Sequence, residues 1–413
     1  MGEIKTASQI LAEQTADNPY QLDFNAILRS PLMADYKPIN SSNPLLCNLH
    51  MAQHVMRQSG NASLAPLLPL LLSIRGKPYH LHDHFPFAPF FRTRMPRMTL
   101  LKTGRQVSKS TSLAAQGILL SNCIPYFSTL YITPLFEMIR RFSQNYVAPF
   151  IETSPVGNLF SGESTINNVL QRSFKNRSQM IFSFAYLDAE RTRGISADKN
   201  VIDEVQDMDI SFLPIIHETI SASKSYGLIA YAGTPKSLDN TIEKLWLDSS
   251  MSEWVIKCPH AGCGKWNIPA LEHDLVKMIG PAHDGISEKC PGVVCAVCQK
   301  PMNPRPYSQG GTGRWVHRHP EKRWSFAGYH VPQIIMPMHY ADQEKWQKWW
   351  RCKQRQKRFS VAILHSYCRV RFNARWSRGH YLRLPQHDAA RSRKRSSNNF
   401  EHHGSVQVQP CGA

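Results

Sequence analysis

Leu100-Leu-Lys-Thr-Gly-Arg-Gln-Val-Ser-Lys-Ser-Thr111 is the stretch on which the interpretation of this chain depends. An apolar run leads there into a short polar turn, and a helical pattern follows. This order is typical of a P-loop, in which backbone N–H groups of the turn and of the helix N-terminus bind phosphate groups. Lys109 would neutralise the phosphates, and the hydroxyl of Ser110 would hold Mg²⁺. Thr103 and Ser108 stand where this loop usually has glycine, so the stretch alone fits an ordinary polar turn about equally well.

The segment after this stretch alternates between β-rich runs and helical patterns. Strands are predicted over residues 129–133, 180–186, 201–202 and 228–232, and a helix over 135–146. This alternation predicts an α/β domain with a mostly parallel sheet. In such sheets ligands bind at the carboxyl ends of the strands.

Two further polar motifs follow predicted strands. In Asn200-Val-Ile-Asp-Glu-Val-Gln-Asp207, Asp203 would hold the Mg²⁺ that bridges nucleotide phosphates, and Glu204 would act as general base on the attacking water. In Gly233-Thr-Pro235, Thr234 would present a hydroxyl beside the phosphates and sense the γ-phosphate. Each motif alone is compatible with a surface turn. Their order and spacing after the first stretch favour nucleotide hydrolysis.

Together, residues 104–111, 202–207 and 233–235 resemble the ATPase domain of the large subunit of tailed-phage terminases, and Arg193-Gly194 is a further similarity. The resemblance extends over roughly residues 77–350. It implies a P-loop NTPase fold of the RecA/ASCE class that binds ATP and Mg²⁺. It also implies that ATP hydrolysis drives translocation of double-stranded DNA into a procapsid.

The resemblance implies individual roles as well. Lys109 and Ser110 would bind phosphate and Mg²⁺, Asp203 would be the Mg²⁺ carboxylate, and Glu204 the catalytic base. Thr234 would couple hydrolysis to movement. Arg105 would be a candidate catalytic arginine finger, because a guanidinium offers planar donors to the charge on the γ-phosphoryl group; a finger from a neighbouring subunit is the alternative. The nucleotide-binding loop would consist of Gly104, Arg105, Gln106, Val107, Ser108, Lys109, Ser110 and Thr111.

Four cysteines form two closely spaced pairs, Cys258 with Cys263 and Cys295 with Cys298, separated by 31 residues. Four thiolates suit a tetrahedral structural Zn²⁺, which would stabilise a small insertion that lacks a large core. Two additional candidate ligands are Cys290, which stands outside the pairs, and His260, which lies within the loop of a pair. Buried free thiols are the alternative.

The net charge of +19 is distributed unevenly over the 413 residues. Residues 351–413 contain 14 Lys and Arg against Asp388 and Glu401 alone, which is typical of a solvated tail that can also contact nucleic acid.

The longest apolar patch, residues 64–74, is broken by two prolines, so no membrane-spanning segment is predicted. We expect a protein of the host cytoplasm, where the ten cysteines stay reduced.

The chain is predicted to divide into an N-terminal helical region (1–76, with helices at 3–15 and 44–57), a P-loop ATPase core (77–250), a zinc-knuckle insertion (251–310), a return to the ATPase domain or linker (311–358) and a basic tail (359–413). Terminases of the family it resembles continue into an RNase H-like nuclease domain with a two-metal acidic site. The tail has too few acidic residues for that site, so no nuclease activity is expected. We hypothesise an interrupted reading frame near Phe359, which the other frames of the coding DNA would test.

The resemblance implies double-stranded DNA, a small terminase subunit, the portal of the procapsid and further copies of this chain as partners. Two alternatives stay open from the sequence. One is a helicase-like DNA-dependent ATPase, because Asp-Glu-Val-Gln also resembles helicase signatures. The other is a zinc-stabilised DNA-binding protein whose P-loop is degenerate.

Overall fold

The structure is a computed structural model that describes residues 44–58, 61–160, 166–185, 189–236, 240–269, 277–278, 293–339 and 344. The predicted helix at 3–15, Cys290 and the basic tail at 359–413 lie outside the described residues. Within the described ranges, no helix combines the length and the apolar character needed to cross a membrane.

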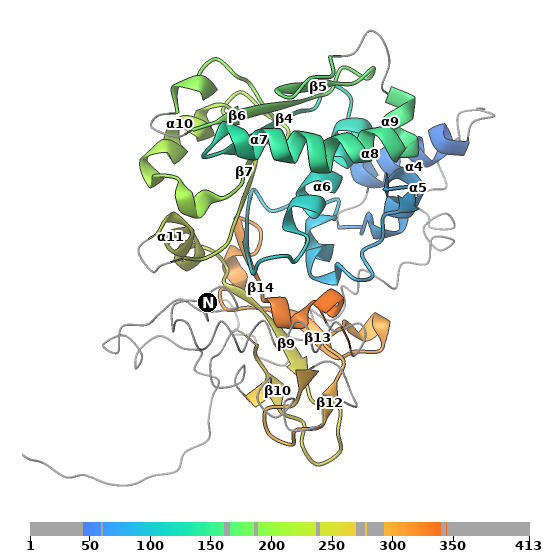
Figure 1. The fold of residues 1–413 in the computed structure, drawn as a ribbon, viewed down its shortest axis with the longest axis vertical. Helices are drawn as coiled ribbons and strands as arrows, with labels where there is room; N and C mark the ends of the chain where they lie inside the picture. The colour runs from blue at the N-terminus through green and yellow to red at the C-terminus, as the bar shows by residue number, and fades with distance from the viewer. Residues whose placement is uncertain are drawn as a thin grey trace, which may run out of the picture. The chain divides into compact units, whose positions relative to one another are not determined.

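One large sheet organises the described part of the chain (Figure 1). Its strands are β3 (Met98–Thr103), β4 (Ser128–Thr133), β5 (Gln171–Ser173), β6 (Gln179–Phe184), β7 (Lys199–Ile202), β8 (Leu228–Gly233), β9 (Ser252–Lys257), β10 (Trp266–Asn267), β13 (Gly313–His317) and β14 (Phe326–Val331). They lie in the order β10-β9-β14-β3-β8-β7-β4-β6-β5, with β13 paired to β9. The run from β9 to β6 is parallel, whereas β5, β10 and β13 are antiparallel to their neighbours. The predicted mostly parallel α/β sheet is therefore confirmed.

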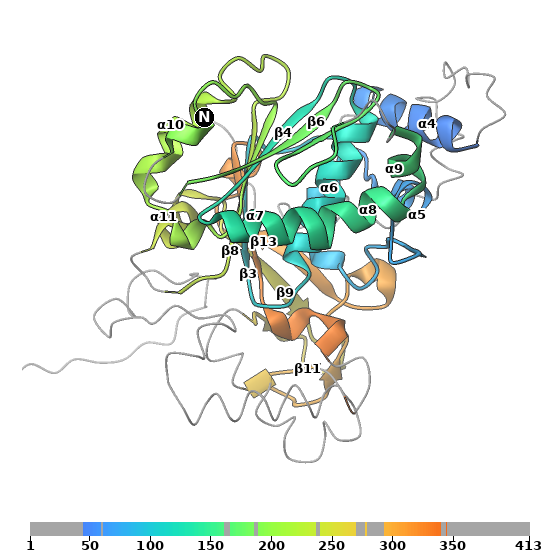
Figure 2. The same cartoon turned by 45° about the horizontal axis from the view of Figure 1, so that its top comes forward.

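Helices cover both faces of this sheet (Figures 1 and 2). The α-helices are α4 (Pro44–Gln58), α5 (Leu68–Leu71), α6 (Lys109–Cys123), α7 (Phe136–Phe142), α8 (Ala148–Thr153), α9 (Pro155–Phe160), α10 (Leu213–Glu218) and α11 (Thr241–Asp248). Apolar side chains of α4 to α9 belong to one core cluster, and those of α10 and α11 belong to another. Two short hairpins complete the fold, β1 (Ser73–Ile74) with β2 (Lys77–Pro78) and β11 (Val293–Val294) with β12 (Pro301–Met302).

Neighbouring residues of the central strands pack into different core clusters. Leu101 and Val201 belong to the cluster with α6, whereas Leu100 and Ile202 belong to the cluster with α10 and α11. Successive side chains of a strand point to opposite faces, and here both faces are covered. This burial on both sides explains why these strands are continuous apolar runs in the sequence.

The predicted strands at 129–133, 201–202 and 228–232 correspond to β4, β7 and β8, and the predicted helix at 135–146 corresponds to α7 and a following π-helical turn, Ser143–Val147. The structure adds β9 and β14 to the main sheet. Strand β14 pairs with β3 along its whole length, although more than 200 residues separate them. Because β9 is part of the main sheet, the boundary predicted at residue 251 falls before a sheet strand, and the cysteine-bearing segment starts after Lys257.

Candidate nucleotide site and cysteine cluster

The loop between β3 and α6 has the backbone of an anion-binding turn. Gln106 and Ser108 adopt left-handed conformations, with φ of 56° and 64°. This conformation costs a residue other than glycine about 1–2 kcal/mol, and strain of this kind is concentrated at functional sites. Val107, buried between the two, anchors the turn in the core. At the start of the loop, the N–H of Gly104 donates to the carbonyl of Val331 at 2.9 Å and extends the β3–β14 ladder.

The strand order brings the three predicted motifs together at one edge of the sheet. Strand β8 lies between β3 and β7, so Thr103, Gly233 and Ile202 end three neighbouring parallel strands. The hydroxyl of Thr103 donates to the carbonyl of Gly233 at 3.4 Å. Strand β8 therefore separates β3, which leads into the loop, from β7, which leads into the acidic pair. Strand β8 itself leads into the third motif.

Lys109 connects the loop to both carboxylates of the second motif. Its Nζ lies 2.6 Å from Oδ1 of Asp203 and 2.6 Å from Oε1 of Glu204. Lys109 and Asp203 are buried, and Glu204 is half-buried. Burial alone would lower the pKa of Lys109, but the two carboxylates outweigh it and raise this pKa. Burial would raise the pKa of Glu204, and the ammonium of Lys109 outweighs it and lowers that pKa. Both groups are therefore charged at neutral pH.

Tyr131 on β4 orients Asp203 and was not identified from the sequence. Its hydroxyl donates to Oδ2 of Asp203 at 2.8 Å, and its ring stacks on Phe142 at 3.8 Å between centroids. Burial, followed by the negative charge of Asp203, raises the pKa of Tyr131 well above its ordinary value, so the phenol stays a donor. The carbonyl of Ile132 accepts from the N–H of Asp203 at 2.8 Å. Asp203 is therefore held from the neighbouring strand as well as by Lys109.

Gln206 connects the acidic motif to the third motif, and sequence reasoning missed it too. Its Nε2 donates to Oε2 of Glu204 at 2.6 Å, and its Oε1 accepts from the N–H of Thr234 at 3.1 Å. A Cβ at Gly233 would collide with Oε1 of Gln206. Gly233 therefore permits a close approach rather than an unusual turn. The adjacent carboxylate of Asp207 accepts from Lys236 at 2.6 Å.

The remaining predicted site residues differ in their surroundings. Ser110 and Thr111 lie half-buried in the first turn of α6. The side chain of Arg105 is exposed and makes no ion pair within the described ranges. Arg193 forms an exposed ion pair with Glu190 at 2.9 Å.

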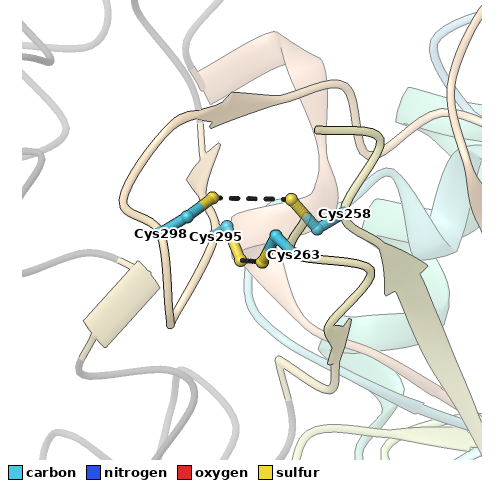
Figure 3. Close-up of side chains that lie close together, drawn as sticks. All are labelled: Cys258, Cys263, Cys295 and Cys298. Carbon is cyan, nitrogen blue, oxygen red and sulfur yellow. Dashed lines mark hydrogen bonds between the residues drawn. The ribbon is translucent and has the colours of Figure 1, made fainter. Parts of the chain in front are cut away.

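The four paired cysteines meet in space (Figure 3). The sulfur atoms of Cys258 and Cys298 lie 3.6 Å apart, and so do those of Cys263 and Cys295. All four lie within 4.8 Å of one another. Zinc–thiolate bonds of about 2.3 Å in a tetrahedron require sulfur–sulfur distances of about 3.8 Å. Donor type and spacing therefore both fit Zn²⁺.

Two similar turns present these sulfur atoms. The N–H of Cys258 donates to the carbonyl of Lys265 at 2.8 Å, and the N–H of Cys295 donates to that of Lys300 at 2.9 Å. The first turn joins β9 to β10, and the second joins β11 to β12. Each cysteine pair is thus positioned at the end of a hairpin by backbone hydrogen bonds that involve no metal.

Backbone donors also face the cluster. The N–H of Val297 donates to the sulfur of Cys295 at 3.5 Å. Burial raises the pKa of Cys295, but backbone donors outweigh it and lower this pKa to about 7. Of the additional candidates, Nδ1 of His260 lies 3.3 Å from the sulfur of Cys258, and Cys290 lies outside the described residues.

Comparison with known families decides the identity of this domain. The model of the phage terminase large subunit gpA ATPase domain matches residues 90–315, which include all three motifs and the four paired cysteines. The chain belongs to this family. The loop after β3, the acidic pair after β7 and the intervening strand β8 accordingly lie within a terminase large-subunit ATPase domain.

Solved structures similar to this terminase chain include large terminases of other phages. The ATPase domain of the Thermus phage P74-26 large terminase is 13% identical, with a TM-score of 0.40 over 70% of this chain and 92% of that one. The large terminase of bacteriophage HK97 is 11% identical, with a TM-score of 0.37 over 45% of this chain and 40% of that one. No curated protein sequence matches the terminase chain.

Proposed function

We propose that this chain is the ATP-hydrolysing motor subunit of a phage terminase that translocates double-stranded DNA into a procapsid. The observation that supports this most directly is the contact of one lysine, Lys109, with both Asp203 and Glu204. A cation of the phosphate-binding loop and two carboxylates of a neighbouring motif are the groups that ATP hydrolysis needs within one site. The alternative of a degenerate P-loop gives no reason for this convergence.

The residues of the site fit their proposed roles chemically. Asp203 and the hydroxyl of Ser110 are oxygen ligands of the kind that Mg²⁺ prefers, and the ion would supply charge neutralisation at the β- and γ-phosphates. Lys109 would exchange its carboxylate contacts for phosphate oxygens. Glu204, released from the ammonium, would accept a proton from the attacking water. The exposed guanidinium of Arg105 could contact the γ-phosphoryl group from the same loop.

Coupling to movement is proposed to pass through Thr234 and Gln206. The side chain of Gln206 contacts both the proposed base, Glu204, and the backbone of Thr234. A change in the position of Glu204 during hydrolysis therefore alters a hydrogen bond to the third motif. In the described part of the chain, Gln206 makes no hydrogen bond to the loop or to Lys109. It therefore acts as a positioning residue.

The decisive experiment measures phosphate release by wild type and by Glu204→Gln, with and without double-stranded DNA. We expect the variant to bind ATP but to hydrolyse it at least about 100-fold more slowly, because it lacks the general base. Glu137→Gln is the matched control, since Glu137 is a partly exposed glutamate of α7 that pairs with Arg140. DNA-stimulated hydrolysis without strand separation supports the motor, strand separation supports the helicase-like alternative, and no hydrolysis by wild type contradicts both.

We also propose that Cys258, Cys263, Cys295 and Cys298 hold a structural Zn²⁺, supported by the four sulfur atoms within 4.8 Å. A fully protein-ligated ion stabilises a segment with a small core and has no open position for catalysis. Metal analysis of purified protein should find one zinc per chain in wild type and in Cys47→Ser, and a large loss in Cys295→Ser. Unchanged zinc content in Cys295→Ser would refute the assignment.

The wider assembly is part of the same proposal. The small terminase subunit, the portal and further copies of this chain are the proposed partners, in the host cytoplasm. The proposed division of the chain is a helical region (1–76), an ATPase core (77–250), a zinc-knuckle insertion within 251–310 that follows the sheet strand β9, a return segment (311–358) and a basic tail (359–413).

A further inference from the structure

A cavity lies at the edge of the sheet opposite the proposed nucleotide site. Its volume is about 760 Å³, and its lining comes from the segments before β3, β8 and β14 and from the C-terminal ends of α4 and α6. Strand β3 has six residues, so the length of the strand, about 20 Å, separates this cavity from the phosphate-binding loop. Its volume is in the range of about 300–1,000 Å³ that is typical of ligand-binding cavities.

Three arginines with no acidic partner line this cavity. Arg57, Arg94 and Arg97 are exposed, and none of them forms an ion pair in the part of the chain that the structure describes. Asp198 lies near the cavity, but its carboxylate already accepts from the N–H of Ser128 at 2.9 Å and from the hydroxyl of Ser223 at 2.7 Å. Within the described residues, the three guanidinium groups of the cavity therefore remain open to an anionic ligand.

Four aromatic residues line the cavity together with the arginines. Tyr126 is 75% exposed and Tyr226 is 41% exposed. The ring of Tyr226 is fixed edge-on against Phe127, with centroids 5.1 Å apart and an interplanar angle of 84°. The guanidinium of Arg94 lies over the ring of Trp324, 4.2 Å from its centroid. The cavity thus combines two solvent-accessible tyrosine rings, one of them packed against Phe127, with guanidinium groups.

We propose that this cavity binds a nucleic-acid strand and accommodates an unpaired nucleotide. Phosphates contact Arg57, Arg94 and Arg97, while the base stacks on Tyr226 or Tyr126. An acidic peptide would satisfy the charge, but it would leave the exposed rings without a flat partner. Bases stack on aromatic side chains regardless of sequence, and arginine contributes to both contacts. The proposal rests on the proposed function only in taking DNA as the natural ligand.

The electrostatic part is tested by fluorescence anisotropy with a labelled single-stranded oligonucleotide and the full chain. We expect the triple variant Arg57→Gln/Arg94→Gln/Arg97→Gln to bind about 100-fold more weakly at about 0.1 M salt, because each lost phosphate contact removes about 0.7 from the slope of log K against log salt. The slope itself should fall by about 2.

The matched control is the triple variant Arg140→Gln/Arg141→Gln/Arg193→Gln. These arginines are also exposed, but each pairs with a glutamate outside the cavity. The control loses the same formal charge, and we expect it to bind within about threefold of wild type. Equal weakening in both triple variants would reduce the effect to net charge and overturn the site.

The stacking part uses a duplex with a short single-stranded overhang and a blunt duplex of the same sequence. We expect wild type to prefer the overhang about tenfold, and Tyr126→Ala/Tyr226→Ala to lose this preference with an unchanged salt slope. No preference in wild type would overturn the nucleotide assignment. Melting temperatures near that of wild type ensure that the variants report on binding.

Basal ATP hydrolysis separates this inference from the proposed function. The arginine triple variant should hydrolyse ATP without DNA as fast as wild type, because the two sites lie at opposite edges of the sheet. If wild type binds DNA through the cavity but does not hydrolyse ATP, the motor proposal fails and the site stands. If the triple variant hydrolyses ATP and binds DNA as wild type does, the site fails and the motor proposal stands.

Discussion

Positively charged side chains have opposite surroundings at the two edges of the central sheet. At the carboxyl edge, buried cations have acidic partners within the chain: Lys109 pairs with Asp203 and Glu204, and Lys102 pairs with Glu243 at 2.8 Å. At the amino edge, by contrast, the exposed arginines of the cavity make no ion pair within the described ranges.

The buried lysine at the start of β7, Lys199, shows the same lack of an acid. Its Nζ donates to Oε1 of Gln116 and lies 4.8 Å from the ring centroid of Phe90. Burial lowers its pKa to about 7. Lys109, buried to a similar extent but facing two carboxylates, has a raised pKa. The partner, not the depth of burial, decides the charge of each lysine.

This difference indicates what each edge can bind. The charges of the carboxyl edge compensate one another, so a ligand must compete with an existing contact of Lys109. At the amino edge a cation either meets an anion from outside, as proposed for the cavity, or has a pKa lowered by burial, as Lys199 does. The following experiments test this contrast at residues of both edges.

The largest effect is expected from Lys109→Ala. ATP hydrolysis should fall at least about 1,000-fold, because the variant loses the phosphate contact of the loop. It should also be less stable by about 3 kcal/mol, since Asp203 and Glu204 are left side by side without a cation. Phosphate release and urea unfolding measure the two effects. Lys175→Ala, which removes an exposed lysine, is the control. Hydrolysis within tenfold of wild type would contradict the assignment of this edge.

A smaller effect is expected from Gln206→Ala. The kcat for ATP should fall about 10- to 100-fold with little change in KM, because Gln206 orients the proposed base and has no hydrogen bond to the loop in the described structure. Gly233→Ala should show the same change, since its added methyl group collides with the Gln206 amide. Gln171→Ala is the control, because Gln171 lies on the edge strand β5 and its side chain pairs only with Gln179 of β6 among the hydrogen bonds of the described residues. A change in KM alone would contradict the positioning role.

Much of the carboxyl edge could be predicted from the sequence because its signals are local. Apolar runs predict the strands, and the polar motifs follow them directly. The spacing of the cysteines predicted a cluster, and the four sulfur atoms do meet. The catalytic and ligand roles assigned to these residues stay predictions.

The contacts across strands could not be predicted, because they depend on strand order. Nothing in the sequence near Lys109 indicates that β8 separates β3 from β7 or that Tyr131 of β4 meets Asp203. Gln206 reaches Thr234 for the same reason. The cavity at the amino edge is lined by residues of loops and helix ends from positions between 53 and 324, none of which forms a motif.

The smallest effect concerns Lys199 and depends on pH. Its pKa of about 7 in the folded chain lies below the ordinary 10.5, so between these values the unfolded chain binds more protons than the folded one. Stability contributed by this group therefore rises with pH above 7, by at most about 1.4 kcal/mol per pH unit, and does not change below 7.

In Lys199→Met this rise should vanish, so the stability advantage of the variant over wild type should shrink by about 1 kcal/mol per pH unit from 7 to 9.5. Urea unfolding at constant ionic strength measures it, with Lys175→Met as the exposed control. A pH-independent difference between Lys199→Met and wild type would mean that Lys199 keeps its proton, and the contrast between the two edges would then not extend to this lysine.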